Sequence, residues 1–413
     1  MHLRTISRAL LALTLISLFC AASPAQAQAP LGEGDGFFAA LHDGEGSVAF
    51  RYRFEYVDQD GKSEQALAST LRTAMRYQTM QYRGLDLFLE ATNVADMGSG
   101  PYSLPGDPAV NYPVVADPLL SMMNQAFLRW TGSNGAIKGG RQELVYDNAR
   151  FVGNVGWRQN HQNFDSVRAD WTLIEKLGLR YTYIGQVHTI TDVELDLYGH
   201  IVNASYDLNR FGKLRGYALM LDFDVAKAAN SNTFGGSWVG NLPLGEGPWN
   251  LKWRGEYAVQ QDAYDNPGSI DATYMHLMGG FGQEKIGIGV GFEQLSGSME
   301  DGQFNTAFAT AHKFNGWADK FLKTPTGGLN DFYVSAGGKA SSFGYVATWH
   351  KFDAESTDAV YGTEIDALVT YKTSWKQLLA VKGAIYSADG DAPVGTGQAS
   401  DVTKVWFYTT FTF

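Results

Sequence analysis

Charged and aromatic residues alternate in the segment 47–57, and this spacing indicates a strand between two different solvents. Arg51, Arg53 and Glu55 occupy every second position, and the positions between them are aromatic. Successive side chains of a strand point to opposite faces, so the charges share one face and the rings share the other. An Arg or Lys that faces hydrocarbon at the middle of a membrane costs about 2–4 kcal/mol. If the aromatic face meets lipid, the charged face must line a water-filled interior.

The same alternation places further bases on the charged face of other segments. Together they form the predicted solute path: Arg51, Arg53, Arg72, Arg76, Arg129, Arg141, Arg168, Arg180, Lys252 and Arg254. The acids on these segments are fewer: Glu55, Asp86, Glu90, Asp170 and Glu256. A net basic interior would concentrate anions and exclude cations. Alternatively, each arginine pairs with an acid and only braces the wall, and for any single arginine both interpretations stay open.

These residues must be positioned by many strands of similar length. The segments with period-2 alternation are 47–57, 66–78, 84–92, 122–131, 136–142, 165–173, 177–187, 197–207, 214–224, 233–241, 249–259, 271–281, 285–295, 329–337, 342–352, 363–373, 378–387 and 402–413. Many are close to the roughly 10 residues that cross a bilayer as a tilted strand. Their connections alternate between short and long. The sequence therefore predicts an all-β fold, a transmembrane antiparallel up-and-down β-barrel of eighteen strands over 47–413, with sixteen strands as the alternative. A barrel this wide encloses an aqueous channel.

The two ends of the chain predict its location. Arg4, Arg8, the apolar stretch 9–22 and Ala25-Gln26-Ala27 are typical of a cleaved signal peptide over 1–27. The segment 28–46 would then be a short periplasmic N-terminal tail. The last strand ends on Phe413, and an aromatic-ended final strand behind a secretory signal is typical of bacterial outer-membrane barrels. We therefore expect the Gram-negative outer membrane, contact with its lipid, and recognition of this strand by the barrel-assembly machinery.

Composition excludes several kinds of chemistry. The single cysteine, Cys20, lies inside the predicted signal peptide, so the mature chain would have no disulfide, zinc-thiolate site or cysteine nucleophile. The formal net charge of −11 argues against a nucleic-acid partner. No Gly-x-Ser-x-Gly, His-Glu-x-x-His or Walker motif is present, and the histidines are scattered. We therefore expect no enzyme, no cofactor and no metal, with a barrel-embedded hydrolase as the alternative from another class.

The long connection 143–164 contains charged and aromatic residues that a solvated cap would not need. Its candidate constriction residues are Asp147, Arg150, Arg158 and His161. Phe151, Trp157 and Phe164 need a place to be buried, so we expect this loop to fold inward and narrow the pore. The connection 296–328 is a second candidate for inward folding.

Three stretches resemble the alginate export family of outer-membrane porins. They are Arg51–Glu55 (RYRFE), Gly140–Gly153 (GRQELVYDNARFVG) and His312–Leu322 (HKFNGWADKFL). The resemblance covers essentially the whole mature chain and implies an eighteen-stranded barrel with an arginine- and lysine-rich pore for an anionic polysaccharide such as alginate. From residues and resemblance together we expect a passive outer-membrane channel for anionic solutes or an acidic polysaccharide. A channel for uncharged or hydrophobic small molecules remains the alternative.

Overall fold

The computed structural model describes residues 29–107, 111–393 and 396–413. The predicted signal peptide, 1–27, lies outside the described residues. Eighteen strands form one antiparallel sheet, and two residue pairs in a loop form a separate small hairpin. The barrel strands are β1 (Glu45–Gln59), β2 (Ala66–Gln78), β3 (Leu85–Asp96), β4 (Ser121–Gly132), β5 (Gly135–Gln142), β6 (Asn163–Ile174), β7 (Leu177–His188), β8 (Glu194–Asp207), β9 (Lys213–Phe223), β10 (Ser231–Pro243), β11 (Asn250–Asp262), β12 (Asp271–Gly282), β13 (Gly287–Leu295), β16 (Leu329–Ala340), β17 (Phe343–Asp353), β18 (Val360–Lys372), β19 (Leu378–Ala388) and β20 (Val402–Thr412).

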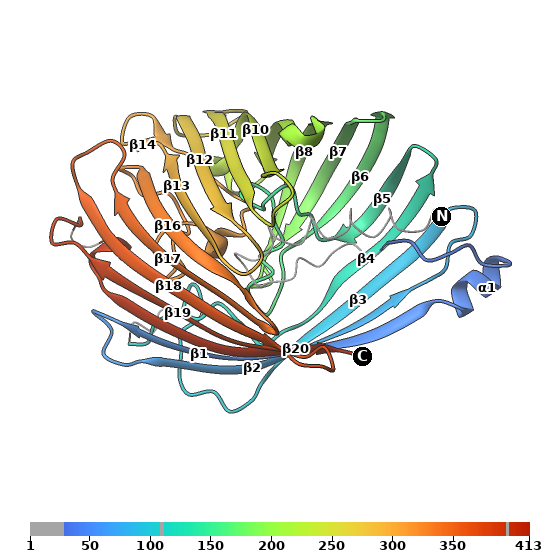
Figure 1. Cartoon of the computed structure of the whole chain (residues 1–413), viewed down its shortest axis with the longest axis horizontal. Helices are drawn as coiled ribbons and strands as arrows, with labels where there is room; N and C mark the ends of the chain where they lie inside the picture. Colours follow the sequence, from blue (N-terminus) through green and yellow to red (C-terminus); the bar gives the residue numbers. More distant parts are fainter. Residues whose placement is uncertain (1–28, 108–110, 394–395) are drawn as a thin grey trace.

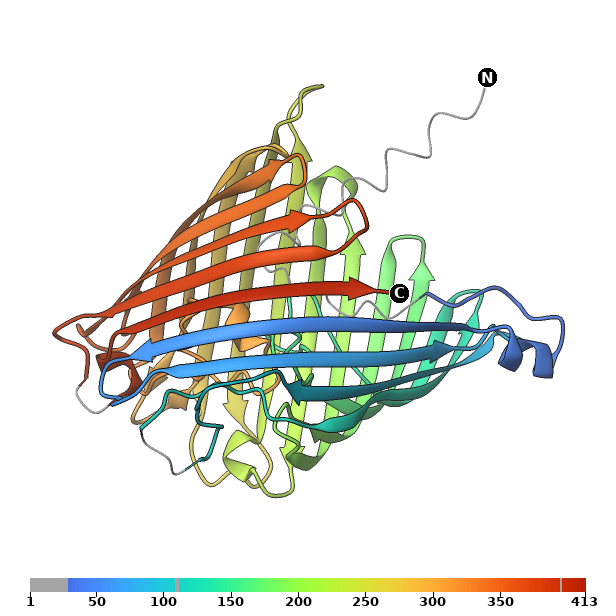
Figure 2. The ribbon, with the colours of Figure 1, turned by 90° about the horizontal axis from the view of Figure 1, so that it is seen from below.

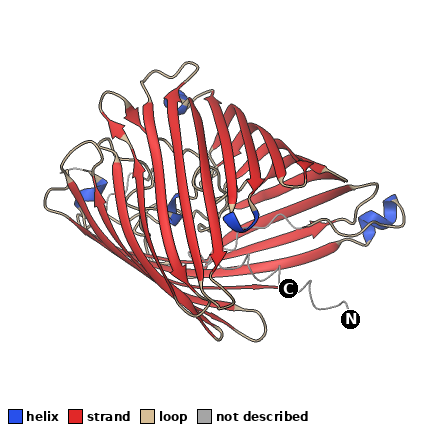
Figure 3. Cartoon of the chain, turned by 45° about the horizontal axis from the view of Figure 1, so that its top comes forward, coloured by secondary structure: helices blue, strands red, loops and turns tan. Residues whose placement is uncertain are grey.

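The sheet closes on itself because the first strand pairs with the last. Phe50 lies opposite Phe411, and Val48 and Phe413 exchange two backbone hydrogen bonds. Figure 2 shows the red β20 beside the blue β1, and Figure 3 shows that strands make up nearly all of the molecule. The predicted eighteen-stranded barrel is confirmed, and the sixteen-stranded alternative is wrong.

The outer face of the barrel is apolar because the strands alternate. In β17, side-chain burial changes at almost every residue, and in β4 the outward Leu128 is 52% exposed while the inward Arg129 is 8% exposed. Such exposed rings and aliphatic chains recur around the whole barrel, as a lipid-facing surface requires. Separately, no helix within the described residues is long and apolar enough to cross a membrane.

The predicted strand boundaries differ from the observed ones mainly at the rims. β8 and β18 each begin three residues before the predicted positions, at Glu194 and Val360, because strand pairing continues beyond the amphipathic stretch. β1 begins at Glu45 rather than at residue 47. The N-terminal tail contains a short helix, α1 (Phe37–His42), which the alternation analysis did not predict.

Short turns gather at the rim where β1 begins and β20 ends, and the longer loops lie at the opposite rim. We call these the turn rim and the loop rim. Three of the long connections turn into the barrel: the β3–β4 loop (97–120), the β5–β6 loop (143–162) and the β13–β16 loop (296–328). The last one contains the small hairpin β14 (Gly297–Ser298) and β15 (Gly302–Gln303). Figure 1 shows coil between the two walls of the barrel.

Candidate channel lumen and constriction

The β5–β6 loop lies inside the barrel and reaches opposite walls. Arg158 pairs with Glu55 on β1 at 3.1 Å, and Arg150 pairs with Glu293 on β13 at 3.0 Å. Trp157 is 6% exposed, so the aromatic side chain finds its burial here. The loop therefore narrows the lumen and is held at both ends by charges.

Asp147 anchors the same loop to a third part of the wall. One of its carboxylate oxygens accepts from Arg254 on β11 at 2.8 Å, and the other forms an ion pair with Arg215 on β9 at 3.1 Å. Burial alone would raise the pKa of Asp147, but these guanidinium groups hold it below its usual value. The fourth predicted constriction residue, His161, is buried and contacts Glu143 at 2.7 Å, and burial lowers its pKa.

The β3–β4 loop supplies a carboxylate that the sequence analysis did not select. Arg53 donates to Asp117 of this loop and to the carbonyl of Trp157. Next to it, Arg51 donates to the Gln159 side chain and to the carbonyl of Gly156, both at 2.8 Å. The two arginines predicted as pore-facing therefore point inward, and both hold the constriction loops in place.

The β13–β16 loop is fixed by a buried network that we call the latch: His312 and Asp319 of the loop with Lys382, Lys404 and Arg158. Asp319 accepts from His312 at 2.6 Å, from Lys404 on β20 at 2.8 Å and from Arg158 at 3.0 Å. Nζ of Lys382 on β19 lies 2.6 Å from Nε2 of His312. An ammonium group only donates, so Nε2 accepts and Nδ1 carries the imidazole proton.

Aromatic rings surround the latch. The Trp157 ring stacks on the His312 ring, with centroids 4.4 Å apart and planes 4° apart. Lys382 Nζ lies 3.8 Å from the Trp317 ring centroid and 4.0 Å from that of Trp157, in cation–π geometry. Burial lowers the pKa of His312 well below its usual value. Burial would raise the pKa of Asp319, but its three donors hold it well below its usual value.

Most of the predicted inward bases are paired with acids, as the bracing interpretation requires. The ion pairs on the wall are Arg72 and Arg76 with Glu90, Arg129 with Asp86, Arg168 and Arg180 with Asp170, and Arg254 with Glu256. Lys252 points inward from β11 and makes no ion pair with any described residue at salt-bridge distance.

Arg141 is a correction to the predicted solute path. It lies opposite Ala126 in the register that places Gly139 opposite Leu128 and Ile137 opposite Trp130, and this is the outward face. Its guanidinium is neutralised by Asp165 through two hydrogen bonds of 2.9 Å near the loop rim. A charge was taken to indicate the lumen, but at a rim a paired charge can face outward because it lies beyond the hydrocarbon.

The lumen wall is divided by charge, which the sequence analysis missed. Most of its bases lie on β1–β11, with Lys382 on β19 and Lys404 on β20, whereas the inward positions of β13–β18 carry acids: Glu293, Asp331, Glu364 and Asp366. These acids are covered by the β13–β16 loop, whose backbone amides at Trp317 and Ala318 donate to Asp366 and Glu364. Only strands between β1 and β11 contributed to the predicted count of bases and acids. We call this part of the wall the basic arc.

Within the basic arc, Arg76, Arg168 and Arg180 reach water, whereas Arg72, Arg129 and Arg254 are nearly covered. The Arg76 side chain is 26% exposed over a fully covered Glu90, and Arg180 is 30% exposed. Asp170 is 32% exposed. Because Glu90 is covered and Asp170 is shared between two arginines, the water-facing part of this arc carries net positive charge.

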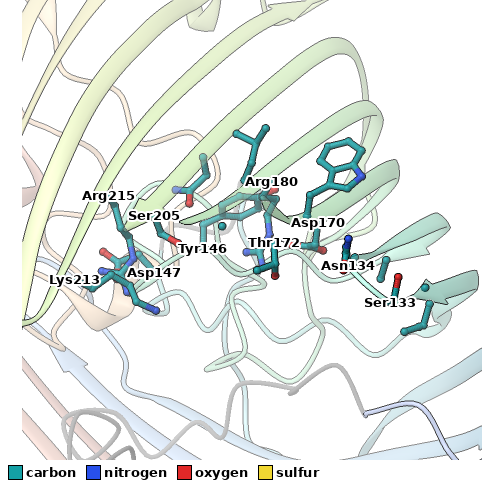
Figure 4. A pocket seen from close by; sticks show the side chains of 18 residues that line it. Ser133, Asn134, Tyr146, Asp147, Asp170, Thr172, Arg180, Ser205, Lys213 and Arg215 are labelled. Atoms are coloured by element: carbon teal, nitrogen blue, oxygen red, sulfur yellow. Dashed lines mark hydrogen bonds and ion pairs between the residues drawn. The ribbon is translucent and has the colours of Figure 1, made fainter. Parts of the chain in front are cut away.

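A polar cavity of about 650 Å³ lies between the β5–β6 loop and the wall of β4–β9 (Figure 4). Arg180, Lys213 and Arg215 line it together with Asp147 and Asp170. The turn residues Ser133 and Asn134 also line the cavity, so it lies toward the turn rim.

A second cavity, of about 250 Å³, lies across the loop against β10–β17, and we call it the niche. Part of its wall has no projecting side chains because inward positions that lie opposite each other on neighbouring strands are glycine: Gly280 opposite Gly289, and Gly287 opposite Gly337. Lys252 and Lys313 line it beside His276, whose Nε2 lies 2.8 Å from the hydroxyl of Tyr333. Nδ1 of His276 is buried and has no hydrogen-bond partner among the residues that the structure describes. The niche thus combines apolar space with cations and an unused polar atom.

The latch was partly within reach of the sequence. His312 and Asp319 lie in the stretch that resembles the alginate export family, and Lys404 lies on the inward face of the final strand. Asp117 carried no comparable signal. Among the described residues, no group of three or more His, Cys, Asp or Glu side chains is arranged to hold a metal ion.

No protein-family model matches the chain, and no curated protein matches it. Solved structures do. Pseudomonas aeruginosa OpdL is 14% identical, with a TM-score of 0.67 over 90% of this chain and 99% of that one. P. aeruginosa OpdK, solved with vanillate, is 13% identical, with a TM-score of 0.67 over 89% and 98%. Acinetobacter baumannii OccAB2 is 15% identical, with a TM-score of 0.69 over 89% and 98%.

These similar structures are outer-membrane porins of Gram-negative bacteria, and none of the three is an alginate export protein. At this identity the likeness establishes the architecture. The chain has the fold of an eighteen-stranded outer-membrane porin, and its closed, apolar-faced barrel is that of an outer-membrane protein.

Proposed function

We propose that the protein is a passive outer-membrane channel for small anionic solutes. The observation that carries this proposal is the basic arc, where Arg76 reaches water over a fully covered Glu90, and Arg168 and Arg180 share the single carboxylate of Asp170. Cations held in a low-dielectric shell raise the local concentration of anions. Lys252 and Lys313 in the niche extend this positive surface across the β5–β6 loop.

The inward loops favour small solutes over a polymer. The β5–β6 and β13–β16 loops cross the lumen and are fixed by buried ion pairs, so the free path is narrower than the barrel. Alginate or another acidic polysaccharide remains the prediction of the family resemblance, and a size series tests it. OpdK was solved with vanillate, an aromatic carboxylate, and that suggests a carboxylate of this size as a first probe.

Ion selectivity in planar bilayers tests the proposal. We expect a reversal potential that shows anion preference in a potassium chloride gradient. The variant Arg76→Gln/Arg168→Gln/Arg180→Gln should lose most of that preference. The matched control, Arg210→Gln/Lys285→Gln/Lys376→Gln, removes the same charge from exposed turns at the turn rim and should retain that preference. Cation preference in the unchanged protein would contradict the proposal.

Liposome uptake of a matched series separates the candidate cargoes. Monomeric uronate should enter faster than a neutral sugar of equal size, and long oligouronates should be excluded. Equal entry of the neutral and charged sugars would favour the channel for uncharged molecules, and passage of long oligouronates would favour polysaccharide transport. Release of hydrolysis products from any probe would favour the barrel hydrolase.

A further inference from the structure

The short helix α1 leaves its large apolar side chains uncovered. Phe37 is 51% exposed, Phe38 is 82% exposed and Leu41 is 40% exposed, whereas Ala40 is buried. Ala40 belongs to the side that contacts the barrel, since its carbonyl accepts from the backbone of Met80. A helix of six residues has little stability of its own in water, so its conformation depends on what it contacts.

The helix lies on the lipid side of the turn rim. Tyr77 occupies an outward position of β2, in the same alternation as the 59%-exposed Met75, and its hydroxyl donates to the carbonyl of Leu41. The Phe37 ring meets the Tyr82 ring edge-on, with centroids 5.8 Å apart. In Figure 2, α1 projects beyond the ends of β1 and β2 rather than into the barrel. The exposed rings therefore continue the outer apolar surface.

We propose that α1 is an interfacial anchor whose Phe37, Phe38 and Leu41 insert into the phospholipid leaflet at the turn rim. Aromatic side chains favour the boundary between headgroups and acyl chains, and short helices with one apolar face lie in that plane. Arg83, whose guanidinium lies 5.3 Å from the Tyr82 ring centroid, supplies a cation for a lipid phosphate beside the helix. The occupant of this face is thus phospholipid, continuous with the lipid around β2.

Site-directed spin labelling in phospholipid nanodiscs tests the anchor. With Cys20→Ala as background, Phe38→Cys gives a unique labelling site. Ile365→Cys, 57% exposed on the outer wall, is the lipid reference, and Val225→Cys, 88% exposed in the loop after β9, is the water reference. We expect the label at 38 to resemble the label at 365. The ratio of its oxygen accessibility to its nickel-chelate accessibility should be at least threefold higher than the same ratio for the label at 225.

A label at 38 that matches the label at 225 would overturn the proposal. So would a label that is shielded only after a periplasmic extract is added, because the occupant would then be a protein. Leu41→Cys checks the face independently, since it should behave like position 38, whereas Asp43→Cys should behave like the water reference. Equal accessibility of the labels at positions 41 and 43 would also contradict the proposed orientation of the helix.

Discussion

Asp319→Asn should loosen the constriction, because Asp319 is the only anion among the latch residues. Its carboxylate accepts from His312, Arg158 and Lys404. The Asp319, Arg158 and Lys404 side chains are at most 7% exposed. An asparagine of the same shape offers one accepting oxygen and no charge, so at least one buried cation loses its partner.

The magnitude follows from the burial of these groups. Removal of one partner from a buried ion pair costs about 3–5 kcal/mol, since the remaining charge stays desolvated. Each 1.4 kcal/mol changes an equilibrium about tenfold, so the ratio of released to docked loop should rise by roughly 10²- to 4 × 10³-fold. The β13–β16 loop would detach from β19 and β20 and take with it the Trp157 stack on His312.

Single-channel recording measures this change directly. We expect Asp319→Asn to show a larger mean conductance and frequent transitions between conductance levels, while strand content by circular dichroism stays the same. Asp358→Asn is the matched control, because it removes the same charge from an exposed outer loop. A conductance and noise level in Asp319→Asn equal to those of the control would refute the role of the latch in holding the constriction.

Three further outcomes are expected. Lys252→Gln should reduce uptake of a small carboxylate severalfold with little change in thermal stability, because this ammonium makes no ion pair with the described residues; unchanged uptake would remove the niche from the solute path. Acidification should weaken loop docking, because the docked state keeps the pKa of His312 and of Asp319 low. Docking is then strongest above about pH 6.5 and weakens by up to about 1.4 kcal/mol per proton and pH unit below it; constant conductance noise from pH 7.5 to 4.5 would contradict this. Gly316→Ala should loosen the same loop by more than about 1 kcal/mol, because Gly316 has a φ of +82° and a methyl group there would meet the Glu364 carboxylate; conductance noise equal to that of the unchanged protein would argue against this.

Strand number and the facing of most strands could be predicted because alternation is a local property of the chain. Val405 and Phe407 face outward as expected, since hydrocarbon selects every second residue of β20. The constriction could not be read in this way. Arg53 finds its carboxylate in Asp117, in another loop, and no period connects the two. Trp406 occupies an inward position that the alternation marked as polar, yet it is fully buried because loops cover it.

Misplacement of Arg141 has a related cause. A charge on a strand indicates water, but water lies beyond the rims as well as in the lumen, and only the observed register with Ala126 distinguishes the two. The acids of β13–β18 were not counted for a similar reason. One oxygen of Glu364 and one of Asp366 accept from backbone amides of a loop whose path depends on the folded barrel.

The pairing of β1 with β20, which closes the barrel, lies beside the ion pairs that hold the interior loops in place. Arg158 holds Glu55 of the first strand and Asp319, and Asp319 holds Lys404 of the final strand. The interior loops thus connect the first strand to the last across the closure of the barrel. Before β20 pairs with β1, the contact of Asp319 with Lys404 is missing, so we expect closure of the barrel and docking of the constriction loops to occur together.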